Sequence, residues 1–203
     1  ILGICGGLQM LGEYLEDPHS KEGLNSSKKN GNILGICGGL QMLGESLEDP
    51  HSKEGLNSSK KKSIKGIGLL PLKTIFSQDK ITKRITCYSN WPCTEKIDGF
   101  EIHNGITKII KKDNSCNVCD IFRENSLGWY SDCNERGIIA GTYIHGLFEN
   151  DKWTTSLINL LREKKGIPIL DKANKSYKIK KESIIDNLAK QFTKHINISA
   201  LLN

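Results

Sequence analysis

The sequence contains no long hydrophobic run and no secretory signal, so we expect neither a membrane-spanning helix nor a membrane partner. Aromatic residues are scarce, at 6% of 203 residues, and they do not alternate with the lysines that give the chain its formal charge of +6. Nucleic-acid grooves combine clustered basic side chains with aromatic rings. Because these lysines are scattered in short runs, we interpret them as solvated surface and expect no nucleic-acid partner.

The cysteines also lack the pattern of a disulfide framework. Their number is seven, and an odd number without a secretory signal favours reduced thiols in the cytoplasm. Cys116 and Cys119 have the spacing of a metal-ligand or redox pair. A single such pair is a weak signal, because a structural zinc site needs four ligands. We therefore expect no metal site.

A segment of 29 residues occurs twice with a period of 32, and its single change is Tyr14 against Ser46. Solenoid repeats share a pattern, not a literal sequence, and need about three copies or more for stability. We interpret residues 1–32 as an extra, recently duplicated copy and residues 33–203 as one domain. Since the chain begins with Ile inside a motif, we expect it to be a fragment that lacks its N-terminal part.

Each copy carries the motif I-L-G-I-C-G-G-L-Q-M-L-G, with Cys5 in the first and Cys37 in the second. Apolar and small residues before the cysteine predict a strand, and the two glycines after it predict a sharp turn. Leucines at i, i+3 and i+7 predict one face of a following helix that ends at Asp49-Pro50: Leu40, Leu43 and Leu47. This arrangement projects the cysteine sulfur from the backbone and favours its thiolate form.

Three glycines around the cysteine are expected to permit a strained backbone and the close approach of a substrate: Gly35, Gly38 and Gly39. The N–H of Gly38 is directed to where an oxyanion would form. A nucleophilic cysteine needs a base, and the best candidate is His145, where an apolar strand ends at a glycine. On these residues alone, a catalytic and a merely buried cysteine both remain open.

Other segments rich in β-branched residues predict strands at 67–75, 81–88, 100–110, 119–123, 128–131 and 138–144. Turn signals lie at 90–92, 98–99 and 134–137. A helix is predicted over Asp151–Lys164, begun by Asn150 or Asp151 and ended by Gly166. A second helix follows with one apolar side: Ile185, Leu188, Ala189, Phe192 and Ile196. The mixture predicts an α/β sandwich.

Together these residues resemble a known family. G-I-C-G-G-L-Q is similar to the nucleophile motif G-x-C-x-G-x-Q of class I glutamine amidotransferases. Longer matches resemble the glutaminase domain of the cobyric acid synthase family: I-C-G-G-L-Q-M-L-G with L-E-D-P, then G-I-G-L-L, F-E-I-H-N-G and G-T-Y-I-H-G-L-F-E-N-D. They follow the family's order from Ile33 to about Lys164. Each motif alone is moderately specific, and four in order are strong.

The resemblance implies an open, mostly parallel sheet flanked by helices, flavodoxin-like and incomplete at its N-terminus. It implies that Cys37 attacks the side-chain amide of glutamine and forms a thioester, with His145 moving the protons. Gln41 and the N–H of Gly38 would hold the glutamine and its oxyanion. His103, in E-I-H-N-G, would lie near the site, where substrate binding and a structural role are both open.

The resemblance also implies a partner domain. Ammonia would amidate a corrinoid, cobyrinic acid diamide, in an N-terminal synthetase domain that uses ATP and Mg²⁺. No stretch here resembles a phosphate-binding loop, so no cofactor is expected in this domain. Alternatives are another cobalamin-type amidotransferase (cobyrinic acid a,c-diamide synthase or the enzyme that acts on peptidoglycan lipid), a non-catalytic remnant and a thiol metal-binding module.

Two features of the site are left open by the motifs. Typical class I enzymes carry H-P-E, whereas His145 is followed by Gly146 and Leu147, so the third member of the triad is unassigned. The cobalamin-type subfamily shares this departure. The nucleophile is assigned to Cys37 because the second copy continues at family-like spacing into G-I-G-L-L. Cys5 stays a duplicate candidate, since the two motifs are identical.

Overall fold

The structure is a computed structural model, and it describes residues 2–4, 31–50, 63–110, 117–124, 126–133, 137–170 and 177–195. The chain divides into two units, Ile1–Leu147 and Phe148–Asn203, and each is described by itself. The first unit holds both sheets and the candidate site. The second holds two helices, α2 (Asp151–Lys164) and α3 (Tyr177–His195), and a short 3₁₀ helix, η4 (Leu147–Glu149), spans the boundary.

The first sheet has the strand order β1-β2-β9-β8-β7. Its strands are β1 (Leu2–Ile4), β2 (Ile33–Ile36), β7 (Val118–Asp120), β8 (Gly128–Cys133) and β9 (Gly137–Thr142). β1 pairs parallel with β2 and β2 pairs parallel with β9, whereas β8 is antiparallel to both of its neighbours. The first strands of the two copies of the repeat therefore lie side by side, with Leu2 opposite Leu34 and Ile4 opposite Ile36.

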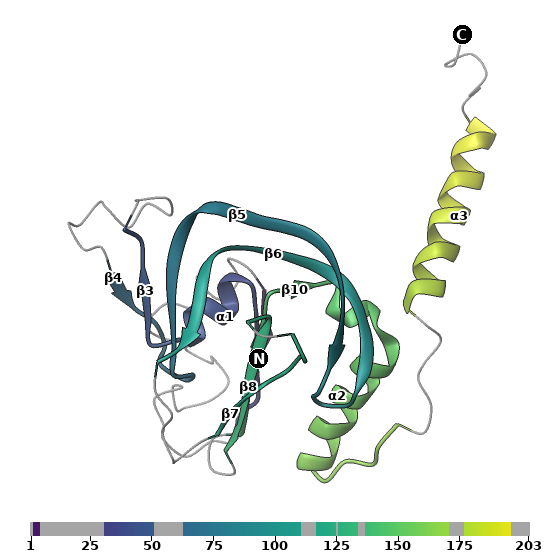
Figure 1. Cartoon of the computed structure of the whole chain (residues 1–203). Helices are drawn as coiled ribbons and strands as arrows, with labels where there is room; N and C mark the ends of the chain where they lie inside the picture. The colour runs from purple at the N-terminus through teal and green to yellow at the C-terminus, as the bar shows by residue number, and fades with distance from the viewer. Residues whose placement is uncertain are drawn as a thin grey trace, which may run out of the picture. The chain divides into compact units, whose positions relative to one another are not determined.

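The second sheet has the order β10-β6-β5-β3-β4. Its strands are β3 (Ser46–Glu48), β4 (Ser63–Lys65), β5 (Leu72–Ser89), β6 (Glu95–Ile109) and β10 (Ile144–His145). β5 and β6 form a long antiparallel ribbon that arches over α1 (Gly38–Leu43) in Figure 1. Side chains alternate along β6, so that Ile97, Glu101 and His103 are buried and Lys96 and Phe100 are exposed.

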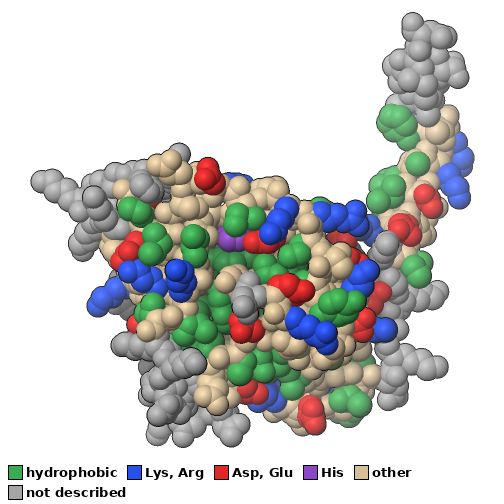
Figure 2. All heavy atoms as spheres, viewed as in Figure 1, with side chains coloured by type: hydrophobic (Ala, Val, Ile, Leu, Met, Phe, Trp, Pro, Cys, Tyr) green, Lys and Arg blue, Asp and Glu red, His purple; other side chains and the backbone are tan. Residues whose placement is uncertain are grey.

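The core of the first unit lies where α1 meets both sheets. Its buried members are Leu40, Leu43, Leu70, Leu72, Trp129, Ile139 and Tyr143. On the face drawn in Figure 2, basic side chains are spread among acidic ones, without a large patch of one sign. None of the described helices is long and apolar enough to cross a membrane. The predicted α/β class is confirmed, and parallel pairing is present for β1, β2 and β9 and between β3 and β5.

The predicted helix through Leu40, Leu43 and Leu47 is wrong in its second half. α1 ends at Leu43, and Leu47 lies on β3 opposite Ile64 and Thr74. The helix stops at Gly44, where an added Cβ would lie 2.8 Å from the carbonyl oxygen of Leu72. Leu47 is nevertheless buried. The regular spacing of leucines thus reflects burial on two successive elements.

Two further predictions need correction. The strand predicted over 67–75 begins only at Leu72, because the preceding N–H groups of Ile67 and Leu69 donate to the last carbonyls of α1. The turn predicted at Asp98-Gly99 lies inside β6. Gly99 is needed there for close approach, since an added Cβ would lie 2.6 Å from the carbonyl oxygen of His145.

The strands at 81–88 and 100–110 are confirmed within the ribbon, and the strand at 128–131 is confirmed within β8. The strand predicted over 119–123 is only partly confirmed, since β7 ends at Asp120. The single strand predicted over 138–144 is wrong at its end, because β9 ends at Thr142 and β10 begins at Ile144 in the other sheet. The helix Asp151–Lys164 is confirmed, and Gly166 follows it with φ 65°. The turn at 134–137 and the last apolar residue of the tail helix, Ile196, lie largely or wholly outside the described residues.

Candidate active site

Cys37 stands between β2 and α1 in a strained backbone conformation, with φ 57° and ψ −115°. Residues other than glycine rarely adopt a positive φ, and they do so where surrounding contacts enforce it. Here the N–H of Cys37 donates to the carbonyl of Thr142 at 2.8 Å, and its own carbonyl accepts from the N–H of Gln41 at 3.2 Å. The strained backbone conformation is that of Cys37 itself, whereas the sequence predicted it at the three neighbouring glycines.

The glycines instead let α1 lie directly on the sheet. A Cβ added to Gly35 would lie 2.5 Å from the carbonyl carbon of Gly39, and one added to Gly141 would lie 2.5 Å from Cδ1 of Leu40. Real Cβ atoms do not approach so closely. These two positions therefore set how deeply the turn at Cys37 sits between β2 and β9. Gly38, half-buried, is the first residue of α1.

Cys37 and His145 meet at a single atom, the carbonyl oxygen of Ile102 on β6. The thiol of Cys37 donates to this oxygen at 3.2 Å, and Nε2 of His145 lies 3.3 Å from it. Both side chains are half-buried. The fold thus brings the predicted nucleophile and the predicted base together from distant parts of the sequence.

Gln41, on α1, also reaches β6, the strand that Cys37 and His145 contact. Its Nε2 donates to the carbonyl of Asn104 at 2.8 Å, and its side chain also hydrogen-bonds Tyr143. The backbone carbonyls of Ile102 and Asn104, two residues apart on β6, therefore accept the side chains of three predicted site residues.

Behind Cys37, the ring of His103 stacks on the ring of Tyr143, with centroids 3.8 Å apart. His103 is held at both nitrogens, since Nε2 lies 3.0 Å from Oε1 of Glu101 and Nδ1 lies 3.0 Å from the carbonyl of Gly105. Lys83 on β5 donates to the other oxygen of Glu101 at 3.0 Å. This buried group extends from the ribbon to the centre of the first unit.

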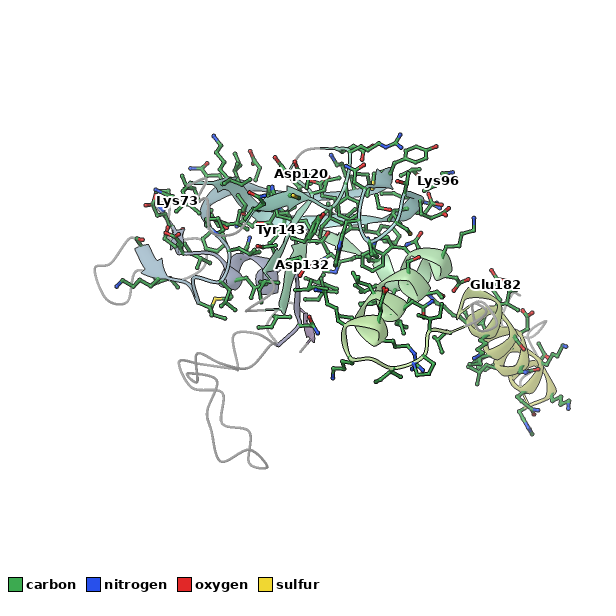
Figure 3. The ribbon with its side chains drawn as sticks, turned by 90° about the horizontal axis from the view of Figure 1, so that it is seen from below. Lys73, Lys96, Asp120, Asp132, Tyr143 and Glu182 are labelled. Atoms are coloured by element: carbon green, nitrogen blue, oxygen red, sulfur yellow. The ribbon has the colours of Figure 1, made fainter. Side chains whose placement is uncertain are left out.

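Figure 3 shows Tyr143 near the middle of that unit, between the two ends of the ribbon that Lys73 and Lys96 mark. The sequence had selected His103 but missed Tyr143, Glu101 and the carbonyl of Ile102. One signal was available: Glu101 and His103 are spaced i, i+2 in a predicted strand, which places both side chains on one face. A backbone carbonyl has no comparable signal.

The electrostatics of this group favour one ionised carboxylate and one neutral phenol. Burial by itself raises the pKa of Glu101, but hydrogen bonds from His103 and Lys83 outweigh it and hold that pKa below its ordinary value. Burial also raises the pKa of Tyr143, against the opposing effect of hydrogen bonds from Thr107 and Gln41. The hydroxyl of Tyr143 therefore stays protonated and can donate.

The other cysteines differ in exposure, and some lie outside the described residues. Cys87 is buried, and that burial, together with the nearby carboxylates of Glu124, Asp98 and Glu101, raises the pKa of its thiol to about 12. Cys119 is exposed. Cys5 and Cys116 lie outside the described residues, so the duplicate nucleophile and the Cys116–Cys119 pair stay predictions.

Comparison with known proteins gives a family model and a set of curated relatives. A family model described as the CobB/CobQ-like glutamine amidotransferase domain matches residues 22–153. Curated relatives named cobyric acid synthase, from three strains of Prochlorococcus marinus, are 58% (MIT 9515), 54% (AS9601) and 43% (NATL2A) identical to the chain. Each match covers 100% of this chain and 34% of the relative. The chain spans about a third of the length of the relatives that it matches.

Proposed function

The chain belongs to the CobB/CobQ-like glutamine amidotransferase family, and we propose that it is the glutamine-hydrolysing part of a cobyric acid synthase. In this proposal it supplies ammonia for the ATP-dependent amidation of corrinoid side-chain carboxylates in cobalamin biosynthesis. The observation that carries it is the meeting of the Cys37 thiol and the His145 imidazole at the carbonyl of Ile102. The names of the relatives favour this function over the other cobalamin-type amidotransferases.

The proposed reaction has two stages. Sγ of Cys37 forms a bond to the amide carbon of the glutamine side chain while the thiol proton passes to Nε2 of His145. His145 returns that proton to the departing nitrogen as the C–N bond breaks, which releases ammonia and leaves a glutamyl thioester. Water then attacks the thioester, with His145 accepting a proton from the water and giving it to the departing sulfur.

Neighbouring groups would hold the glutamine and its developing charge. The N–H of Gly38, the residue after the nucleophile, would donate to the oxyanion of each tetrahedral intermediate. Gln41 is proposed to border the bound glutamine, and it is already fixed in place by its bond to the carbonyl of Asn104. Of the two roles left open for His103, the structural one is proposed, because both of its ring nitrogens lie against Glu101 and Gly105. The strained φ of Cys37 supports this arrangement, because it presents the sulfur at the tip of the turn.

The setting of the domain is part of the proposal. We interpret residues 33–203 as the amidotransferase domain and residues 1–32 as an extra copy. The parallel strands β2 and β9 would belong to the open, flavodoxin-like sheet expected for the family, with β1 of the extra copy added beside β2. ATP, Mg²⁺ and the corrinoid are assigned to the two-thirds of the relatives that this chain does not match. The free thiols of the described part favour a reducing compartment, the cytoplasm.

A glutaminase assay tests the function and the choice of nucleophile together. We expect the wild-type chain and Cys5→Ala to release glutamate from glutamine, whereas Cys37→Ala and the double variant lose activity by about 1,000-fold or more. Activity that survives in Cys37→Ala but not in Cys5→Ala would move the nucleophile to the first copy. A wild-type chain that releases no glutamate even when it is joined to a synthetase domain would be a non-catalytic remnant.

A further inference from the structure

In the part of the chain that the structure describes, the edge of β6 that faces Cys37 is paired with a short strand. β10 pairs Ile144 with Glu101 and His145 with Phe100, and beyond this ladder the N–H of Ile102 still donates to the carbonyl of Tyr143 at 3.4 Å. Successive carbonyls of a strand alternate in direction, so those of residues i and i+2 face the same edge. The carbonyls of Ile102 and Asn104 therefore face the edge beyond the end of β10.

These two carbonyls accept side chains where a longer β10 would place backbone N–H groups. The carbonyl of Ile102 accepts the Cys37 thiol and lies 3.3 Å from Nε2 of His145, and the carbonyl of Asn104 accepts the amide of Gln41. A backbone carbonyl away from water needs a partner. The edge of β6 thus contacts three side chains of the site through its backbone carbonyls and not through its own side chains.

Glu101 and His103 hold this stretch of β6 from its buried face. The two side chains are hydrogen-bonded to each other. Glu101 also forms an ion pair with Lys83 on the neighbouring strand, and His103 also contacts the backbone carbonyl of Gly105. Lys83 is also the register partner of Glu101 across the ribbon. Glu101 and His103 therefore bracket the carbonyl of Ile102, and His103 and Gly105 bracket that of Asn104. The contacts tie this stretch to β5 and to Gly105, where φ is 90°.

From this arrangement we propose that Glu101 and His103 are positioning residues of the glutaminase site. They fix the stretch of β6 whose carbonyls lie against Cys37, Gln41 and His145. The inference rests on the proposed function. Leu147 stands two positions after His145, where typical class I enzymes carry a glutamate, and its side chain cannot orient an imidazole.

Two measurements on the same variants test the inference. The first is the kcat and KM for glutamine hydrolysis. The second is the rate of Cys37 alkylation by iodoacetamide at one fixed pH, followed by peptide mass spectrometry. The peptides that carry Cys5 and Cys37 are distinguishable because they differ at Tyr14 and Ser46. Alkylation needs no substrate, so it reports on the thiol whether or not glutamine is hydrolysed.

The variants are Glu101→Gln, His103→Gln and the double variant. We expect each single change to lower kcat by about 10- to 100-fold, with KM within about twofold, and to slow alkylation of Cys37 by about 5-fold or more. The double variant should be no worse than the worse single variant, because both residues act through the same stretch of backbone. Lys83→Met, which removes a mostly exposed partner, should show a smaller loss in the same direction with the fold intact.

Asp98→Asn is the matched control. It removes a carboxylate from the same strand, but this one lies on the exposed face and accepts from Thr86 at 2.6 Å, so we expect kcat and alkylation within twofold of wild type. A rise in KM at unchanged kcat would overturn the inference and make Glu101 and His103 part of the glutamine pocket. Unchanged kcat and alkylation in all variants would also overturn it. A wild-type chain without glutaminase activity would refute the function, while alkylation would still decide the positioning.

Discussion

The ring of His103 lies almost flat on the ring of Tyr143, with the two planes 18° apart. His103 belongs to the ribbon of β5 and β6, and Tyr143 directly follows β9 of the first sheet. The contact therefore joins the two sheets next to the turn that carries Cys37. Tyr143 continues the connection through hydrogen bonds to Thr107 and Gln41. The consequences for stability and chemistry can be tested one residue at a time.

Removing the hydroxyl of Tyr143 should weaken the fold. In Tyr143→Phe the buried Thr107 keeps its partner Thr74, at 2.6 Å, but loses the hydroxyl that bonds it from the other side. We expect a loss of about 1–2 kcal/mol in the free energy of unfolding, measured by urea denaturation. Tyr88→Phe is the control, because Tyr88 is exposed and should change stability by less than about 0.5 kcal/mol. Equal losses in the two variants would show that the buried hydroxyl contributes nothing.

Glu101 should make the stability of the fold depend on acid pH. The pKa of folded Glu101 lies below its ordinary value of 4.5, so the carboxylate stabilises the fold above that pH and the contribution is lost as the pH falls through the folded pKa. We expect Glu101→Gln to be less stable than wild type at pH 7 and the gap to narrow steadily below pH 4.5. Urea denaturation across this range measures the gap. A gap that widens toward low pH would contradict the lowered pKa.

Gly35 should tolerate no side chain. In Gly35→Ala the new Cβ would meet the backbone of Gly39 and Leu40 at 2.5–2.8 Å, and backbone cannot move aside as a flexible side chain can. We expect a loss of about 2–3 kcal/mol in unfolding free energy and a larger loss of glutaminase activity, since α1 must shift.

Gly68→Ala provides the comparison for that prediction. Nothing lies within 4 Å of a Cβ at Gly68, but its φ is 75°, so the substitution should cost about 1 kcal/mol from backbone strain alone and leave activity near wild type. If Gly35→Ala were as mild as Gly68→Ala, the tight packing of α1 on β2 would be refuted.

The thiol of Cys87 should be unreactive toward alkylating reagents in the folded chain. Its thiol is buried and its pKa is raised to about 12, so almost no thiolate is present at pH 8. We expect iodoacetamide to modify the exposed Cys119 at least about 100-fold faster than Cys87, as followed by peptide mass spectrometry. Cys87→Ser should keep glutaminase activity within twofold. Similar alkylation rates at the two cysteines would show that the ribbon opens readily.

Sequence patterns predicted an element correctly where neighbouring residues in the sequence determine that element. The helix Asp151–Lys164 combines an apolar face with a glycine after its end, and both signals lie within a few residues. The same logic was wrong at Gly99 and Leu47. Gly99 avoids the backbone of His145, and Leu47 is buried on a strand that pairs with β5, so both depend on partners distant in sequence.

The side chains that carry the proposed chemistry could be identified from the amino-acid sequence alone: Cys37 in its glycine turn, His145 at a strand end and His103 in its strand. A turn that carries a nucleophile needs a cysteine between glycines, and a base needs a histidine. These residue types can be recognised in a single amino-acid sequence. How Cys37 and His145 come together could be seen only in the folded chain, because both lie against the backbone carbonyl of Ile102. Every residue has such a carbonyl. This one is available because, among the described residues, β10 pairs with β6 over two residues and then ends.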